Sequence, residues 1–369
     1  MARKPDFRHD DLNVFAHFQA EMGVAENSRR LISLLSSSGI ELNVLPFEAN
    51  TARKQHPLVH PTGAYNPRAK SLSCVNPDQL GSLVASYGIP YSTEIPHIGF
   101  WSWELEDFPK VYRSAANLLN EIWTVSDFAN KSITSSVKTP VRTLRLPVPI
   151  PRRKTKLTRK DLKLPANAFL ITTSFDFNSD VNRKNPVGAI EAFRKAFPKP
   201  GIGVLLLKSI NGKNHTSELE NLKNIAQNRS DIIFMDEYLN HYENHALLEL
   251  SDVFLSLHRS EGYGINLADS MARKTAVIAT GYSGNLDFMD EESGILVPYS
   301  MVEVSNYAGI DVKSQWAEPD LDFAGNAIRR LAEEPQNLRK LGQAGLSKIA
   351  AEHSLGATAK IFRKDFMYV

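Results

Sequence analysis

Two acidic residues with glycines between them stand in the stretch of residues 258–285. Glu261 is followed by Gly262 and Gly264, and Asp269 comes eight positions after Glu261. Carboxylates accept hydrogen bonds from sugar hydroxyls, and glycines let a backbone turn tightly against a ligand. A helix that starts at such a turn also offers unpaired N–H groups to anionic oxygens. We therefore predict that Glu261 contacts hydroxyls and that Asp269, in or near the first turn of the helix, faces a ribose.

A second glycine turn comes shortly afterwards. Ser283, Gly284 and Asn285 follow the apolar segment 275–280, and we expect them at the same rim as the first turn. Each feature has a simpler interpretation, because glycines make ordinary turns and Asp269 would favour a helix dipole. The combination after two consecutive strands favours a site for a nucleotide that carries a sugar.

A basic pair follows another apolar segment, residues 169–177. Arg183 and Lys184 would neutralise a diphosphate as negative charge builds up on a departing oxygen. The alternative is that both side chains are simply solvated at the start of a helix.

An aromatic block around residue 100 indicates a second binding surface. Trp101 and Trp103 would form a platform for the apolar face of a sugar ring, with Glu104 reaching its hydroxyls. His97 would act near the anomeric carbon. The alternatives are an aromatic plug in the core and a structural histidine.

Three further patterns have weaker interpretations. His241 and His245 have a spacing that can bind zinc, but no third ligand is apparent in the sequence. The Asp-Leu-Asp triplet at 320–322 is better explained as a helix cap than as a metal site. The basic run 152–160 is either a solvated linker or a contact with anionic membrane lipid.

These residues must be positioned by an alternation of strands and helices. Short apolar segments alternate with amphipathic ones, which indicates parallel sheets with helices on both faces. The predicted strands are residues 12–18, 41–47, 71–76, 94–101, 121–126, 169–177, 203–209, 231–239, 252–258, 275–280 and 294–299. The tail from residue 321 reads as helical, with breaks near Pro335 and Ser354. We expect an α/β protein of two doubly wound Rossmann-like domains that face a cleft, with ligands outside the carboxyl ends of the strands.

Length and composition limit the class of protein. A chain of 369 residues suits about two domains. We place an N-terminal domain at 1–150, a C-terminal domain at 151–350, and a last helix at 351–369 that packs back on the first domain. The proline- and lysine-rich segment 144–165 is the candidate linker.

The charge and the apolar runs bear on partners and location. A net charge of +2 argues against a nucleic-acid partner, and the single Cys74 excludes an intrachain disulfide. The first residues lack the apolar run of a signal peptide, and no run approaches the roughly 18–20 apolar residues that span a membrane. We expect a cytoplasmic protein, with at most peripheral contact to the inner face of the membrane.

The run 258–289 resembles the donor-site signature of family 4 retaining glycosyltransferases, which have the GT-B fold. Their pattern is two acids separated by seven residues, usually both glutamate, and here the pair is Glu261 and Asp269. Further blocks resemble the same family, at residues 99–109, 121–129, 175–197 and 316–324.

The resemblance implies a role for each site residue. Lys184 matches a lysine that precedes a helix in the family, whereas Asn178 stands where an upstream arginine is expected, so that Asn178 or Arg183 takes its place. The implied catalytic residues are Lys184, Arg183 and Glu261. The implied donor-binding residues are Asn178, Gly262, Tyr263, Gly264, Ile265, Asn266, Asp269, Ser283, Gly284, Asn285 and Gly23. The implied acceptor-binding residues are Trp101, Trp103, Glu104 and His97.

The implied activity is transfer of a hexose, with retention, from a nucleotide-diphospho-sugar to a saccharide or lipid-linked saccharide. The blocks look most like those of bacterial mannosyl- and rhamnosyltransferases of surface-polysaccharide or lipopolysaccharide synthesis. GDP-mannose is therefore the first expected donor, followed by dTDP-rhamnose and UDP-glucose, and no metal or other cofactor is expected. Two other classes stay open: a non-catalytic nucleotide-sugar-binding protein, and an NAD-dependent oxidoreductase, which the absent G-x-G-x-x-G fingerprint disfavours.

Overall fold

The computed structural model describes residues 12–47, 53–57, 60–90, 94–227 and 229–367. The prediction that the chain starts without a signal peptide concerns residues 1–11, which lie outside the described residues. Over the described part of the chain, no helix combines the length and the apolar character needed to cross a bilayer.

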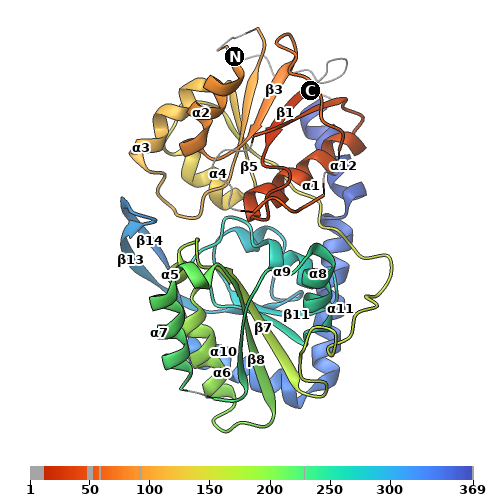
Figure 1. Ribbon diagram of the computed structural model, residues 1–369, viewed down its shortest axis with the longest axis vertical. Helices are drawn as coiled ribbons and strands as arrows, with labels where there is room; N and C mark the ends of the chain where they lie inside the picture. Colours follow the sequence, from red (N-terminus) through yellow and green to blue (C-terminus); the bar gives the residue numbers. More distant parts are fainter. Residues whose placement is uncertain (1–11, 48–52, 58–59, 91–93, 228, 368–369) are drawn as a thin grey trace. The chain divides into compact units, whose positions relative to one another are not determined.

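The chain divides into two compact units. Unit 1 comprises Met1–Val148 together with Glu352–Val369, and unit 2 comprises Pro149–Ala351. The chain passes from one unit to the other after Val148 and after Ala351, next to the boundaries at 150 and 350 that the sequence indicates. The two units are coloured from red to yellow and from green to blue along the chain in Figure 1, with the last helix of the chain belonging to unit 1.

Unit 1 is built on a parallel sheet whose inner strands are buried along most of their length. Its order is β2-β1-β3-β4-β5-β6. The strands are β1 (Leu12–Ala16), β2 (Leu42–Pro46), β3 (Lys70–Cys74), β4 (His97–Trp101), β5 (Glu121–Thr124) and β6 (Val141–Thr143). β1 and β4 are buried at every position, as expected for a sheet covered on both faces. The sequence does not predict β6, because its three half-buried residues carry no apolar run.

Helices cover the sheet of unit 1. They are α1 (Gly23–Ser37), α2 (Pro77–Tyr87), α3 (Lys110–Arg113), α4 (Asp127–Thr134) and α12 (Leu355–Phe362). α1 ends before Gly39, whose φ of +86° suits a residue without a side chain. α12 packs on α1, and the rings of Phe362 and Phe366 meet Trp123 edge-on. The end of the chain thus completes the first unit.

Unit 2 has a parallel sheet of the same kind. Its order is β12-β11-β10-β7-β8-β9. The strands are β7 (Phe169–Asp176), β8 (Gly203–Ile210), β9 (Ile232–Asp236), β10 (Val253–Ser256), β11 (Ala276–Thr280) and β12 (Ile295–Val297). The chain runs outward from β7 to β9 and then returns to build β10 to β12 on the other side. β7 and β10 are therefore neighbours at the point where the strand order reverses, which is where such sheets bind ligands.

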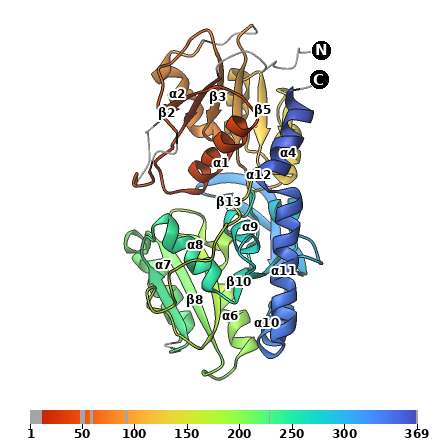
Figure 2. The same cartoon turned by 90° about the vertical axis from the view of Figure 1, so that its right-hand side faces the viewer.

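Helices lie on both faces of this sheet (Figure 1). They are α5 (Val181–Lys184), α6 (Pro186–Ala196), α7 (Thr216–Ala226), α8 (His241–Leu250), α9 (Ile265–Met271), α10 (Leu321–Glu333) and α11 (Pro335–Glu352). α10 packs against α6, as Figure 2 also shows. The helical tail confirms the prediction, with breaks between α10 and α11 and at Ser354, which caps α12. All eleven predicted strands are present, which confirms the pair of doubly wound α/β domains.

A hairpin in unit 2 was not predicted. β13 (Tyr299–Tyr307) and β14 (Ile310–Pro319) pair antiparallel and form a sheet of their own. The two residues that join them, Ala308 and Gly309, both have positive φ, at 50° and 80°. This is the backbone that tight hairpin turns require. The hairpin's outward positions are polar, so its sequence lacks the apolar run that marks the other strands.

The segment expected to be a loose linker is largely part of unit 2. Leu162 and Leu164 are buried in a core cluster with Leu206 and Leu247. Arg159, in the basic run, donates to the carbonyl oxygens of Ala168 and Leu250 and pairs with Asp252 at 2.8 Å. The interpretation of the whole run as a solvated linker is therefore wrong for Arg159, whereas Arg152 to Lys154 are exposed.

Candidate active site

The short helix α5 carries the two predicted cations directly after β7. Asp180 caps it by accepting a hydrogen bond from the backbone N–H of Arg183, at 2.9 Å. Asn185 ends it with a left-handed φ of 54°, and its side chain donates to the carbonyl of Leu257 at 2.9 Å. Because Leu257 follows β10, α5 is fixed to the neighbouring strand's exit.

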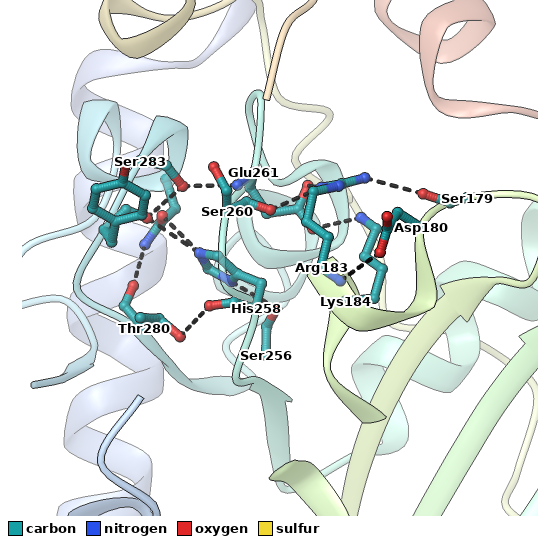
Figure 3. Close-up of polar contacts among 12 residues, drawn as sticks. Ser179, Asp180, Arg183, Lys184, Ser256, His258, Ser260, Glu261, Thr280 and Ser283 are labelled. Atoms are coloured by element: carbon teal, nitrogen blue, oxygen red, sulfur yellow. Dashed lines mark hydrogen bonds and ion pairs between the residues drawn. The ribbon is translucent and has the colours of Figure 1, made fainter. Parts of the chain in front are cut away.

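Arg183 lies against the segment that follows β10. Its side chain is only 4% exposed, and Nη1 donates to the carbonyl oxygen of Ser260 at 2.8 Å. Nη2 donates to Ser179 Oγ at 3.0 Å, and Nη1 lies 3.3 Å from Glu261 Oε2. Figure 3 shows how these side chains converge from the two strand exits.

Lys184 pairs with the same carboxylate. Its Nζ donates to Glu261 Oε1. Burial alone would raise the pKa of Glu261, but the charges of Lys184 and Arg183 outweigh it and lower this pKa to about 2. Two cations thus converge on one ionised carboxylate. The cluster has a surplus of positive charge, which favours binding of an anionic oxygen.

The two glycine turns lie directly against each other. The N–H of Glu261 donates to Ser283 Oγ at 2.8 Å, and the N–H of Gly284 donates to the carbonyl of Glu261 at 3.0 Å. The predicted meeting of these two turns at one rim is what the structure describes. Gly264, with φ of +96°, leads into α9, where Ile265 and Asn266 are the first residues. Tyr263 is buried with its ring 5.0 Å from that of Phe288.

His258 fixes this arrangement, although sequence reasoning gave it no role. Burial lowers its pKa, so the imidazole is neutral. Its Nε2 lies 3.2 Å from the carbonyl oxygen of Tyr282, which can only accept, and 3.2 Å from Asn285 Oδ1. Nε2 therefore carries the proton, and Nδ1 accepts from Ser256 Oγ at 3.0 Å. The side chain holds the second turn to the exit of β10 (Figure 3).

We expect Gly284→Ala to disrupt the site. A methyl group at this position would lie 2.3 Å from the carbonyl oxygen of Gly262, so one turn must move away from the other. Overpacking of this kind costs roughly 1–3 kcal/mol of folding stability. Urea unfolding measures that cost. Gly81→Ala, in the middle of α2 with open space around it, is the control and should stabilise by about 0.5–1 kcal/mol. Equal stability of Gly284→Ala and the native protein would contradict the packing described.

The second acid of the motif is already paired within unit 2. Asp269 lies in the second turn of α9 and is 2% exposed. One carboxylate oxygen is 3.6 Å from His245 Nε2, and the other is 3.9 Å from Arg273 Nη1. Its contact with a ribose stays a prediction, and the structure places a histidine and an arginine beside the carboxylate.

Two residues predicted to bind the donor, Asn178 and Gly23, make no contact with the cation cluster that the structure describes. Asn178 is exposed in the turn after β7, and its Oδ1 is 3.0 Å from Nε2 of His215, whose ring stacks on Phe177. Arg183, and not Asn178, contacts the carboxylate that Lys184 also contacts. Which of the two takes the place of the family's upstream arginine stays a prediction. Gly23 begins α1 and is exposed in unit 1, so its approach to a donor stays a prediction.

The predicted aromatic platform is wrong for the two tryptophans. Trp101 is fully buried and stacks on Phe108, with ring centroids 5.8 Å apart. Trp103 is 6% exposed and lies edge-on to Phe108 and Tyr112, while its Nε1 donates to the carbonyl of Asp107. Both rings pack in the core of unit 1, so neither presents a face to a sugar.

His97 is a structural residue and not a group near an anomeric carbon. It is the first residue of β4, at the strand end opposite to the one where ligands bind. Nε2 lies 2.6 Å from Ser73 Oγ, and the backbone N–H donates to Asn120 Oδ1. Burial lowers the pKa of His97 to about 4, so it stays neutral at physiological pH. Glu104 is half-buried in the loop after β4, and its role stays a prediction.

The two sequence patterns considered for metal binding lie on α8 and at the start of α10. The described residues contain no group of three or more His, Cys, Asp or Glu side chains that is suited to hold a metal ion. The rings of His241 and His245 lie 3.9 Å apart on α8. Asp320 accepts hydrogen bonds from the N–H groups of Asp322 and Phe323, which confirms that it caps α10.

Sequence reasoning missed a buried lysine at the end of β8. Lys208 is 4% exposed, and its Nζ donates to the carbonyls of Ser209 and Glu237 at 2.9 and 2.5 Å. Burial lowers its pKa to about 8, although Asp236, Glu237 and Asp176 act in the opposite direction. A single lysine in an otherwise apolar strand was the available signal. The ammonium holds the start of the segment that leads from β9 to α8.

This lysine should make stability depend on pH. Its pKa falls from 10.5 to about 8 on folding, so between these values the unfolded chain binds more protons than the native one. The free energy of unfolding contributed by Lys208 therefore rises as pH increases from about 8 to 10.5. Urea unfolding of the native protein and of Lys208→Met measures it as a difference. A difference that is constant over this interval would contradict the lowered pKa.

Comparison with known proteins connects this site to a family. The family model of glycosyl transferases group 1 matches residues 174–312, which include α5, both glycine turns and β13. By sequence, none of the curated proteins matches the chain.

Solved structures share the fold over nearly the whole chain. HepE from Anabaena, in complex with UDP-glucose, has a TM-score of 0.71 at 13% identity, covering 98% of this chain and 100% of that one. Sucrose-phosphate synthase from Thermosynechococcus elongatus has a TM-score of 0.65 at 16% identity, covering 98% and 100%. A glycosyltransferase from Rickettsia africae has a TM-score of 0.61 at 14% identity, covering 97% and 99%. Residues 174–312 thus match the model of glycosyl transferases group 1, and the chain has the two Rossmann-like units of the GT-B fold that these solved glycosyltransferase structures share.

Proposed function

We propose that this protein is a retaining hexosyltransferase that uses a nucleotide-diphospho-sugar. The observation that carries the proposal is the convergence of Arg183 and Lys184 on the ionised Glu261 where β7 and β10 leave the sheet. These residues lie within the part of the chain that the group 1 family model matches. Paired cations bind a diphosphate, and a carboxylate accepts hydrogen bonds from the hydroxyls of a sugar. This cluster contains both kinds of group.

Each member of the cluster has a defined task in the proposed reaction. Lys184 and Arg183 bind the diphosphate and neutralise the charge that grows on it as it leaves. Glu261, with a pKa of about 2, stays ionised and accepts hydrogen bonds from sugar hydroxyls. It would not serve as a general acid, because it holds no proton at physiological pH. The orientation of Glu261 depends on Ser283, Gly284 and the neutral His258.

The proposed bond changes take place on one face of the sugar. The bond between the anomeric carbon and the phosphate oxygen breaks, and the acceptor oxygen forms a new bond to the same carbon. The acceptor's proton passes to the oxygen of the departing phosphate. We propose this route because the cluster offers Glu261 already paired with two cations, which makes it a poor nucleophile.

GDP-mannose is our first choice of donor, because of the likeness to mannosyl- and rhamnosyltransferases in residues 175–186 and 281–285. UDP-glucose is the second choice, favoured by the fold shared with HepE, which binds it; dTDP-rhamnose is the third. The proposed acceptor is a saccharide or lipid-linked saccharide of surface-polysaccharide synthesis. Peripheral membrane contact through the exposed residues 152–154 is part of this proposal.

A thermal-shift panel tests the function and the donor class together. We expect one of GDP, UDP or dTDP to raise the unfolding temperature of the native protein, and NAD to have no effect. Mass-spectrometric detection of a transferred hexose with the matching sugar nucleotide then separates an enzyme from a binding protein. A response to NAD alone, or to no nucleotide, would refute the proposal.

We also propose that turnover needs no divalent metal. Once an active donor and acceptor are known, EDTA should leave the rate within about twofold of its value, because Lys184 and Arg183 supply the charge that a metal would otherwise bring. Loss of activity in EDTA, restored by Mg²⁺ or Mn²⁺, would show that these two cations are insufficient.

A further inference from the structure

The β13–β14 hairpin is attached to the loops that form the cation cluster. It forms a sheet of its own and adds no strand to the parallel sheet of unit 2 (Figure 1). At its root, Tyr299 of β13 lies with its ring 5.2 Å from that of Tyr282, which directly precedes Ser283. The last residues of β14 meet the segment after β10 through Arg259. Both strands of the hairpin therefore touch a loop of the site.

Backbone hydrogen bonds join three segments side by side. The N–H of Arg259 donates to the carbonyl of Arg183 at 2.7 Å, and the N–H of Ala317 donates to the carbonyl of Arg259 at 2.9 Å. The end of α5, the segment after β10 and the end of β14 are thus held in one row. A helix as short as α5 has too few internal hydrogen bonds to hold its own position, so these external bonds matter.

The side chain of Arg259 makes the same connection a second time. Its Nε and Nη2 donate to the two carboxylate oxygens of Glu318, at 2.6 and 3.0 Å. Nη1 donates to the carbonyl of Asn182, at 2.6 Å, and the guanidinium lies over the ring of Trp316. Asn182 directly precedes Arg183 in the chain. The planar fork of an arginine is suited to bridging a carboxylate and a carbonyl in this way, and a lysine is not.

We infer that Arg259, held by Glu318 of the hairpin, is a positioning residue that sets Arg183 and Lys184 for diphosphate binding. Its charge is neutralised by Glu318, and its three donor nitrogens are used within the protein. It acts on the ligand through α5. The inference rests on the proposed function, because it assigns the hairpin a part in that same site.

Two explanations of the Arg259–Glu318 pair predict opposite results. If Glu318 acted only through its charge, Glu318→Gln would remove a negative charge near the cation cluster and tighten anion binding. If Glu318 positions α5 through Arg259, the same change loosens the cations and weakens anion binding. Misplacement of binding groups by about 1 Å can cost about 100-fold in rate, so weakening of about tenfold in affinity is expected here.

The experiment is a calorimetric titration of the native and variant proteins. The ligands are inorganic pyrophosphate and the nucleoside diphosphate that stabilises the native protein. We expect Glu318→Gln and Arg259→Lys each to weaken pyrophosphate binding about tenfold, and the double variant to lose no more than the larger single effect. Once a donor is known, kcat should fall in both variants by more than the KM for acceptor changes. Asp322→Asn is the matched control. It also removes one carboxylate from unit 2 and breaks an ion pair of 2.6 Å with Lys195, but it does not touch α5.

The outcomes separate the inference from the proposed function. If the native protein binds neither pyrophosphate nor a nucleoside diphosphate, the proposed function fails, and the inference fails with it. If the native protein binds and Glu318→Gln binds equally or more tightly, the inference alone is overturned. Should Arg259→Lys fail to fold, Glu318→Gln decides, because its carboxylate is 36% exposed and its removal is tolerable for folding.

Discussion

A Lys184→Met variant should lose about 100- to 1,000-fold in kcat, the loss that follows removal of one charge-stabilising group from an active site. Methionine keeps the length and the apolar stem of lysine but lacks its charge. Lys184 Nζ contacts the carboxylate of Glu261, which lies 77 residues further along the chain. Because 23% of the Lys184 side chain is exposed, a ligand can reach it. The nucleoside diphosphate that stabilises the native protein should stabilise this variant much less.

A surface lysine of the same unit provides the control for this variant. Lys223 also pairs with a glutamate, Glu220, at 2.8 Å, and 44% of its side chain is exposed. Lys223→Met should leave both kcat and the thermal shift unchanged. A Lys184→Met enzyme with native kcat would show that the diphosphate binds elsewhere. A loss of kcat with an undiminished thermal shift would place Lys184 in the chemical step and not in binding.

The cation cluster was predictable because of where its residues stand in a parallel sheet. Residues just after β7 and β10 belong to the same edge, so Arg183, Lys184 and Glu261 could be assigned to one site from sequence. Their direct pairing could not be predicted. It depends on the reversal of strand order that makes β7 and β10 neighbours, and on the left-handed Asn185 that turns α5 toward β10. A linear sequence shows neither feature.

The errors at Trp101 and Trp103 have one physical origin. An aromatic residue in a loop looks the same in sequence whether its ring faces a ligand or the core. Phe108 and Tyr112 lie only a few residues downstream of Trp101 and Trp103, and they cover both rings. The hairpin was not predicted for a related reason. The exposed faces of its strands are polar, and its turn is marked by the positive φ angles of Ala308 and Gly309, which a sequence does not show.

In the structure, Glu261 contacts the same two cations that the proposed ligand would bind. Its carboxylate is 11% exposed and lies against Arg183 and Lys184. A diphosphate must therefore share or replace this carboxylate when it binds. Because Glu261 is then released to accept hydrogen bonds from the sugar, diphosphate binding and sugar recognition become coupled.

This competition leads to an unusual expectation for Glu261→Gln, namely weaker catalysis with tighter product binding. The amide leaves the buried Arg183 and the half-buried Lys184 without their counter-charge, so folding stability should fall by roughly 3 kcal/mol. A nucleoside diphosphate supplies the missing charge, so its affinity should rise about tenfold, or about 1.4 kcal/mol. The kcat should nevertheless fall by about 100-fold or more, because the sugar loses an ionised acceptor. Calorimetric titration and urea unfolding measure the first two quantities.

Asp231→Asn separates this effect from general destabilisation of unit 2. Asp231 is also buried and pairs with an arginine, Arg229, through both carboxylate oxygens at 2.9 and 2.6 Å, but it lies before β9 and outside the cluster. Its loss should lower stability without raising nucleotide affinity. If Glu261→Gln weakens nucleoside diphosphate binding as much as it weakens catalysis, Glu261 is a partner of the diphosphate complex and not its competitor. Tighter binding in Glu261→Gln alone would mean that the free protein holds its own carboxylate where the donor's phosphate binds.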